Sequence, residues 1–223
     1  MTRKPSYVAL VFFPYFLVML LQLIAQWFDL ALLYQLTKPA LLPLLILPLV
    51  LLVRSRERAF FLALLGLFFS WLGDLALMVP GELWFMVGLG MFLLAHIFYI
   101  WLFVKYLAVN RPHSLSSLYL IWYAALLYLL YPVLGGMFIP VAIYGLVLGA
   151  MGFFATRGNV FILLGGLLFV CSDSLLALNK FLPTEVYHLE HNGFWVMLSY
   201  CLAQVCIAYG VSRELNKTSV QKS

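Results

Sequence analysis

Four ionisable side chains lie inside long apolar stretches of this sequence: Lys38, Asp74, His96 and Asp173. A charged side chain at the centre of a membrane helix costs about 2.5 to 3.5 kcal/mol on insertion scales, so each of the four is a candidate functional residue. Two neighbouring carboxyl groups can divide acid and base work, because one stays protonated while the other is ionised. Asp74 and Asp173 are therefore the first candidates for catalysis.

Each of these residues also has a structural interpretation. A lone histidine is often only a hydrogen-bonded core residue, and Tyr99 lies three positions after His96 on the same helix face. Lys38 could extend its ammonium group to the membrane interface. Each aspartate could take part in an ion pair or in a hydrogen-bonded packing contact. Two carboxyl groups at a similar depth are, however, hard to explain by packing.

The apolar stretches that carry these residues are long enough to cross a membrane, which takes about 20 residues. They cover residues 7–26, 35–53, 59–79, 83–107, 115–131, 133–155, 159–180 and 193–212. The composition, 65% apolar and 9% charged, excludes an ordinary soluble domain. The sequence predicts an all-α polytopic protein of about eight transmembrane helices, with seven if the first is a cleaved signal peptide. We expect one membrane domain, 1–212, and a short, polar, disordered tail, 213–223.

The basic residues indicate the sidedness of the chain. With the N-terminus inside, 11 of the 13 basic residues fall in inside segments, and only Lys38 and Lys180 fall toward the outside. This split follows the positive-inside rule, so we expect an integral membrane protein with both termini cytoplasmic, in the inner membrane if the source is bacterial. The net charge of +5 then reflects topology and does not indicate a nucleic-acid partner. The inside residues are Arg3, Lys4, Arg54, Arg56, Arg58, Lys105, Arg111, Arg157, Arg213, Lys217 and Lys222.

The two halves of the sequence resemble each other weakly. Gly73-Asp74 matches Ser172-Asp173, and Ala95-His96 is echoed by Ala203-Gln204. Such matches would fit two parallel repeats of four helices. Counted along the expected spans, Asp74 lies about five and Asp173 about seven residues from the outer end of its span, and Lys38 lies near the outer start of its span. The three should therefore lie at a similar depth in the outer half of the membrane.

Few residues of this sequence could serve as metal ligands. A catalytic zinc ion needs about three protein ligands, and His96 is the only histidine within the expected spans. His188, Glu190 and His191 form an H-x-E-H cluster in an outer loop, which is a weak signal. Cys171, Cys201 and Cys206 contain no CxxC pair, and we interpret them as buried apolar residues. We predict no metal and no cofactor.

At these polar residues the sequence resembles the YhhN family of multi-pass membrane proteins, which includes the lysoplasmalogenases. The resemblance covers about residues 35–205, and its most specific piece is the SDSLLALNKF stretch at 172–181. The other matching pieces are Thr37-Lys38-Pro39, Gly73-Asp74-Leu75, the stretch 90–99 with His96, Tyr200, and Ala203-Gln204.

The resemblance implies a hydrolase that cleaves the vinyl ether bond of lysoplasmalogens to a fatty aldehyde and a glycerophospho-headgroup. Its partners would be a lysophospholipid substrate and bilayer lipids. Asp74 and Asp173 would be the catalytic pair, because a vinyl ether is hydrolysed by an acid that protonates carbon and a carboxylate that stabilises the cation and positions water. The substrate-binding residues would be Lys38, His96, Ser172, Asn179, Tyr200 and Gln204.

Two other functions remain open from the sequence. An intramembrane aspartyl protease also uses two transmembrane aspartates, but the proline-rich motif of that family is absent beside the last span. A transporter would use Lys38 and the aspartates as an ion or proton relay. The sequence does not indicate the oligomeric state or which aspartate is the acid.

Overall fold

The computed structural model describes residues 5–53, 57–108 and 114–221. Within these ranges the chain forms eight α-helices and two short 3-10 helices, and no strand. The α-helices are α1 (Pro5–Trp27), α2 (Ala31–Leu52), α3 (Arg58–Leu77), α4 (Glu82–Tyr106), α5 (Leu118–Leu134), α6 (Phe138–Ala155), α7 (Val160–Phe181) and α8 (Asn192–Gln221). Six basic residues of the sidedness pattern lie outside the described residues: Arg3, Lys4, Arg54, Arg56, Arg111 and Lys222.

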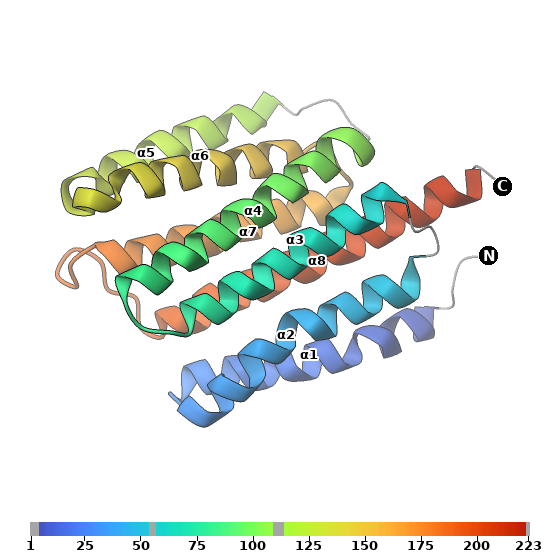
Figure 1. The fold of residues 1–223 in the computed structure, drawn as a ribbon, viewed down its shortest axis with the longest axis horizontal. Helices are drawn as coiled ribbons and strands as arrows, with labels where there is room; N and C mark the ends of the chain where they lie inside the picture. Colours follow the sequence, from blue (N-terminus) through green and yellow to red (C-terminus); the bar gives the residue numbers. More distant parts are fainter. Residues whose placement is uncertain (1–4, 54–56, 109–113, 222–223) are drawn as a thin grey trace.

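The expected all-α membrane architecture is confirmed. Among the described residues, seven helical segments are long and apolar enough to cross a membrane. One of them, Leu118–Ala155, contains both α5 and α6. These two helices fold back on each other through a short 3-10 helix, Gly135–Met137, in which Gly135 adopts a φ of +50° that favours glycine (Figure 1). The bundle therefore has about eight crossings, as the sequence predicts.

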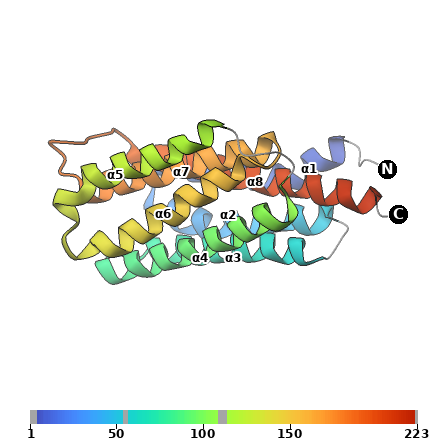
Figure 2. The same cartoon turned by 90° about the horizontal axis from the view of Figure 1, so that it is seen from above.

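The helices run along one common direction in a layered bundle (Figures 1 and 2). Helices α3, α4, α7 and α8 form the centre, with α1 and α2 on one flank and α5 and α6 on the other (Figure 1). The two described chain ends lie at the same end of the bundle, as an even number of crossings requires. We call the opposite end, where α3 meets α4 and α7 meets α8, the distal end.

The packing order of the helices supports the predicted repeat. Helix α3 packs along α4 as α7 packs along α8, and α2 contacts α3 as α6 contacts α7. Helix α4 also contacts α6, as α8 contacts α2. Each half thus brings an aspartate-bearing helix, α3 or α7, into the centre of the bundle.

Helix α2 remains continuous although it contains Pro39, Pro43 and Pro48. Pro43 has no N–H to donate to the carbonyl of Pro39, four residues earlier. Trp71 of α3 donates its indole N–H to that carbonyl instead, at 2.8 Å. The carbonyl group that Pro43 leaves without a donor therefore accepts a hydrogen bond that links the helix of Lys38 to the helix of Asp74.

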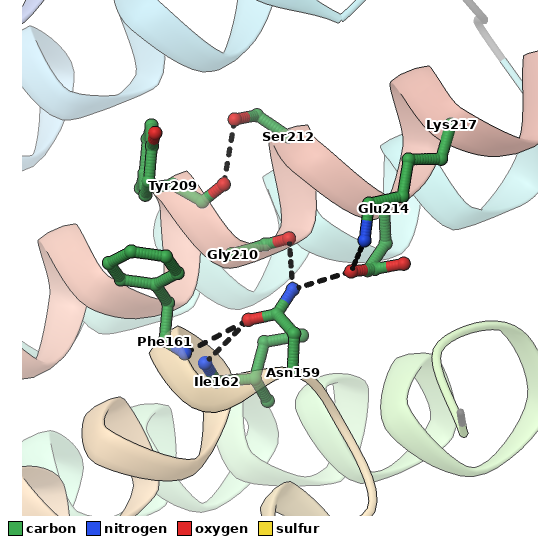
Figure 3. Close-up of polar contacts among 8 residues, drawn as sticks. All are labelled: Asn159, Phe161, Ile162, Tyr209, Gly210, Ser212, Glu214 and Lys217. Carbon is green, nitrogen blue, oxygen red and sulfur yellow. Dashed lines mark hydrogen bonds and ion pairs between the residues drawn. The ribbon is translucent and has the colours of Figure 1, made fainter. Parts of the chain in front are cut away.

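The C-terminal tail is helical, which corrects the expectation of disorder from residue 213. Asn159 caps the start of α7 and donates from its amide nitrogen to Gly210 O and to Glu214 Oε1, each at 2.9 Å (Figure 3). Lys217 donates to the same Glu214 oxygen at 2.9 Å, and Asn216 donates to Leu52 O at 3.1 Å. Because these contacts hold the polar residues against α7 and α2, α8 continues to Gln221.

Candidate active site

A cavity of about 380 Å³ opens among the helices at the distal end, and we call it the chamber. A volume in this range is typical of small-molecule sites. Its wall combines polar groups with apolar side chains. Six of the eight site residues named from the sequence line it: Lys38, Asp74, Ser172, Asp173, Asn179 and Tyr200.

Asp74 is buried in α3, with 3% of its surface exposed. Tyr200 of α8 donates its hydroxyl to Asp74 Oδ2 at 2.7 Å. The neighbouring Gly73 leaves room for Phe92 of α4, since a Cβ at this position would lie 2.6 Å from the phenyl ring. Lys38 and Asp173 line the same chamber as Asp74.

Asp173 of α7 forms a cluster with two side chains from other helices. Tyr144 of α6 donates its hydroxyl to Asp173 Oδ2. His96 of α4 is fully buried, and its Nε2 lies 3.1 Å from the Tyr144 hydroxyl and 3.6 Å from Asp173 Oδ2. The two aspartates thus share the chamber and each accepts a hydrogen bond from a tyrosine, but only Asp173 also has an imidazole within ion-pairing distance.

Lys38 belongs to the chamber wall and is only 6% exposed. Its Nζ donates to Tyr34 Oη, one helical turn earlier, at 3.0 Å. A second amino group, that of the exposed Lys180, lies in the same wall, 5.1 Å from the centroid of the Phe85 ring. The chamber can therefore offer positive charge to an anionic group close to two carboxyl groups.

The structure does not place His96 or Gln204 in the chamber wall. His96 lies behind Asp173, and Gln204 accepts a hydrogen bond from Tyr99 at 2.9 Å. Tyr99 is therefore a partner of Gln204, and the hydroxyl group beside His96 is that of Tyr144. Ser172 of α7 does line the chamber, and its hydroxyl donates to Val196 O of α8 at 3.0 Å.

Sequence reasoning did not find Tyr144 or Tyr34. Tyr144 carried a usable signal, because it is the only residue of α6 whose side chain has a nitrogen or oxygen atom. A buried hydroxyl group needs a hydrogen-bond partner, so a single polar side chain in an otherwise apolar helix suggests a polar neighbour on another helix. Tyr34 carried a local signal, because side chains four residues apart on a helix are neighbours and Lys38 follows it at that spacing.

The outer-loop H-x-E-H residues do not form a ligand set. His191 stacks on the Trp27 ring, with 4.2 Å between the ring centroids and 13° between the ring planes. No three His, Cys, Asp or Glu side chains in the described part of the chain gather as metal ligands would. Cys201 is buried as expected, but Cys171 is exposed and Cys206 is only partly buried, because α7 and α8 turn these faces outward.

The arrangement provides the two carboxyl groups that catalysis by a general acid and a general base requires. Two carboxyl groups face one space, and each has an oxygen occupied by a phenol hydroxyl. Such a hydrogen bond fixes the rotamer of the carboxyl group and leaves its other oxygen for a substrate or a water molecule.

Comparison with known proteins gives this site a context. The model of the YhhN family matches residues 33–211, which include all eight site residues named above. The human lysoplasmalogenase TMEM86A is 32% identical over 156 residues, which are 64% of this chain and 62% of the human protein. The chain thus spans less than two thirds of the length of that relative. No solved structure matches the chain.

Proposed function

The chain belongs to the YhhN family, and on that basis we propose that it is a hydrolase of the lysoplasmalogenase type, which cleaves the vinyl ether bond of a lysophospholipid. It is an integral multi-pass membrane protein. A substrate with one hydrocarbon chain lies in the same bilayer and would enter the chamber from there. The observation that carries the proposal is the pair of aspartates from α3 and α7 that line one chamber together with Lys38.

The proposed reaction needs one carboxylic acid and one carboxylate. The acid transfers its proton to the chain-side carbon of the vinyl ether, and the electron pair of the double bond forms the new C–H bond. The other carbon becomes an oxocarbenium ion, which the carboxylate stabilises as glycosidases do. Water adds to this carbon and loses a proton to a carboxylate, giving a hemiacetal that collapses to aldehyde and alcohol. The net change is the addition of one water molecule, and the pair returns to its starting protonation state.

Lys38 would bind the phosphate group of the substrate. An ammonium group is a compact point charge, and it forms charge-assisted hydrogen bonds with phosphate oxygens. Its hydrogen bond to Tyr34 directs it within the chamber wall. Asn179 and Lys180, both exposed at the end of α7, would lie beside the same headgroup.

Isotope labelling of the products tests this proposal. Purified protein is mixed with a lysoplasmalogen in D₂O or in H₂¹⁸O, and the aldehyde is trapped at once by reduction. We expect one deuterium on the carbon next to the aldehyde carbon and no ¹⁸O in the glycerol product, because the C–O bond to glycerol stays intact. Release of a fatty acid, ¹⁸O in glycerol, or the absence of aldehyde would contradict the proposal. Absence of aldehyde would favour the alternative functions, an intramembrane aspartyl protease or a transporter.

A further inference from the structure

A second, apolar space lies beside the chamber, between α4, α5, α6 and α7. We call it the slot and define it by the residues that line it without reaching the chamber, among them Leu89, Leu126, Leu130, Val141, Gly145 and Ala177. Its lining is almost wholly apolar, and it includes the hydrogen-bonded pair Tyr144 and Asp173, of which Asp173 also lines the chamber.

The slot and the chamber are adjacent. They share five wall residues, which are Leu77, Phe85, Phe92, Asp173 and Leu176. Asp173 therefore stands at the junction between an apolar space and a polar one, whereas Asp74 lines the chamber alone. A molecule that lies across this junction would have its apolar part in the slot and its polar part near Lys38.

The slot is too small to enclose a whole fatty chain. Its volume is about 50 Å³, on a measure by which one water molecule needs about 10 to 15 Å³. This is room for about four water-sized groups, and hence for about four methylene groups. Helix α5, which forms the outer wall, buries only Leu130 and Leu134, so the space beyond the slot borders the bilayer.

We propose that the slot binds the first carbons of the substrate's hydrocarbon chain, next to the vinyl ether bond, while the rest of the chain lies in the bilayer along α5. This rests on the proposed function, because it assumes that the bond lies at Asp173. The slot then selects a single, unbranched chain near the bond and is indifferent to the total chain length. This selection is a specificity device that the acid and base groups alone do not provide.

Two variants of the slot test the proposal by activity. Ala177→Leu fills the slot, and Leu126→Ala enlarges it; Ala124→Leu is the matched control, because Ala124 is exposed on α5 outside the slot. One methylene group in an apolar pocket changes specificity by about 10- to 200-fold. We expect Ala177→Leu to lower kcat/KM for a straight-chain lysoplasmalogen at least about tenfold relative to Ala124→Leu. We also expect Leu126→Ala to raise the relative rate on a substrate with a methyl branch at the fourth chain carbon.

A binding measurement separates failure of the slot from failure of the proposed function. The probe is a saturated 1-O-alkyl lysophospholipid, which has no vinyl double bond, added to protein in lipid nanodiscs. We expect Ala177→Leu, but not Ala124→Leu, to weaken its binding at least about tenfold. If the wild type releases aldehyde but both Ala→Leu variants behave alike, the slot proposal is wrong and the function stands. If the wild type releases no aldehyde, the proposed function fails, and equal binding by both variants would then also overturn the slot.

Discussion

Tyr200 and Asp74 are 126 residues apart in the sequence, yet the tyrosine hydroxyl donates to the carboxyl group at 2.7 Å inside the bundle. The same relationship joins Tyr144 to Asp173. Each candidate catalytic carboxyl group is therefore held by a phenol from a neighbouring helix.

We expect Tyr200→Phe and Tyr144→Phe each to lower kcat while KM changes little. The phenylalanine keeps the ring and removes the donor, so the carboxyl group loses its fixed orientation and its partner. A hydrogen bond to a charged group is worth about 1.5 to 3 kcal/mol, so the variant beside the carboxylate should lose about 10- to 150-fold. The variant beside the protonated acid should lose less, because a hydrogen bond between neutral groups is worth about 0.5 to 1.5 kcal/mol.

Tyr15→Phe is the matched control for these two variants. Tyr15 is fully buried and donates to Cys201 O at 2.7 Å, but it does not line the chamber. The control should lose thermal stability and keep its kcat. If all three variants lost stability and kcat in parallel, the tyrosine hydroxyls would have a structural role only.

The membrane architecture and most of the chamber could be predicted from the sequence. A carboxyl group in an apolar helix must find a polar environment, so Asp74 and Asp173 identified the helices that face inward. Six of the eight site residues named from the sequence do line one chamber. The contacts of His96 and Gln204 could not be predicted, because which neighbour a buried polar group meets depends on how the helices cross.

The helical structure of the C-terminal tail could not be predicted from the sequence either. Its polar composition is typical of disorder, yet Glu214 meets Asn159 from the start of α7 (Figure 3). A contact between residues 55 positions apart leaves no local pattern in the sequence. Tyr144, in contrast, did leave a pattern, as the single polar side chain of its helix.

Lys38→Ala should raise KM for the lysophospholipid more than Lys38→Arg does. The arginine keeps the positive charge, whereas the alanine leaves the phosphate without its partner in the buried wall. Loss of a charge-assisted hydrogen bond predicts an effect of about tenfold or more. Lys105→Ala, at an exposed lysine on the cytoplasmic side of our topology, is the control. Wild-type kinetics in both Lys38 variants would show that its ammonium group binds no substrate.

The topology is tested by reporter fusions at Ser223 and at Glu82. Both described chain ends lie at one end of the bundle, and α4 begins with Glu82 at the distal end (Figure 1). With the basic residues inside, we expect the fusion at Ser223 to report the cytoplasm and the fusion at Glu82 to report the other side. Two fusions with the same sidedness would rule out this topology.

Exhaustive chelation should leave the activity unchanged. The proposed steps use carboxyl groups and water, and the chamber wall contains no histidine or cysteine among the described residues. Turnover is measured after dialysis against a strong chelator, with and without added zinc. An activity that disappears and returns with zinc would replace the two-aspartate mechanism with metal chemistry at His96 or the outer loop.

The most direct measurement is the turnover of Asp74→Asn, Asp173→Asn and the double variant on a lysoplasmalogen. Asparagine keeps the size of the side chain and an oxygen that can accept from Tyr200 or Tyr144, but it can neither donate the acid proton nor carry the negative charge. Each single variant should fold, insert and lose about 100- to 10,000-fold in kcat. The double variant should be scarcely worse than the worse single one, because the pair acts as a unit. Near-normal turnover in either well-folded single variant would remove that aspartate from catalysis, and normal turnover in both would contradict the two-aspartate mechanism.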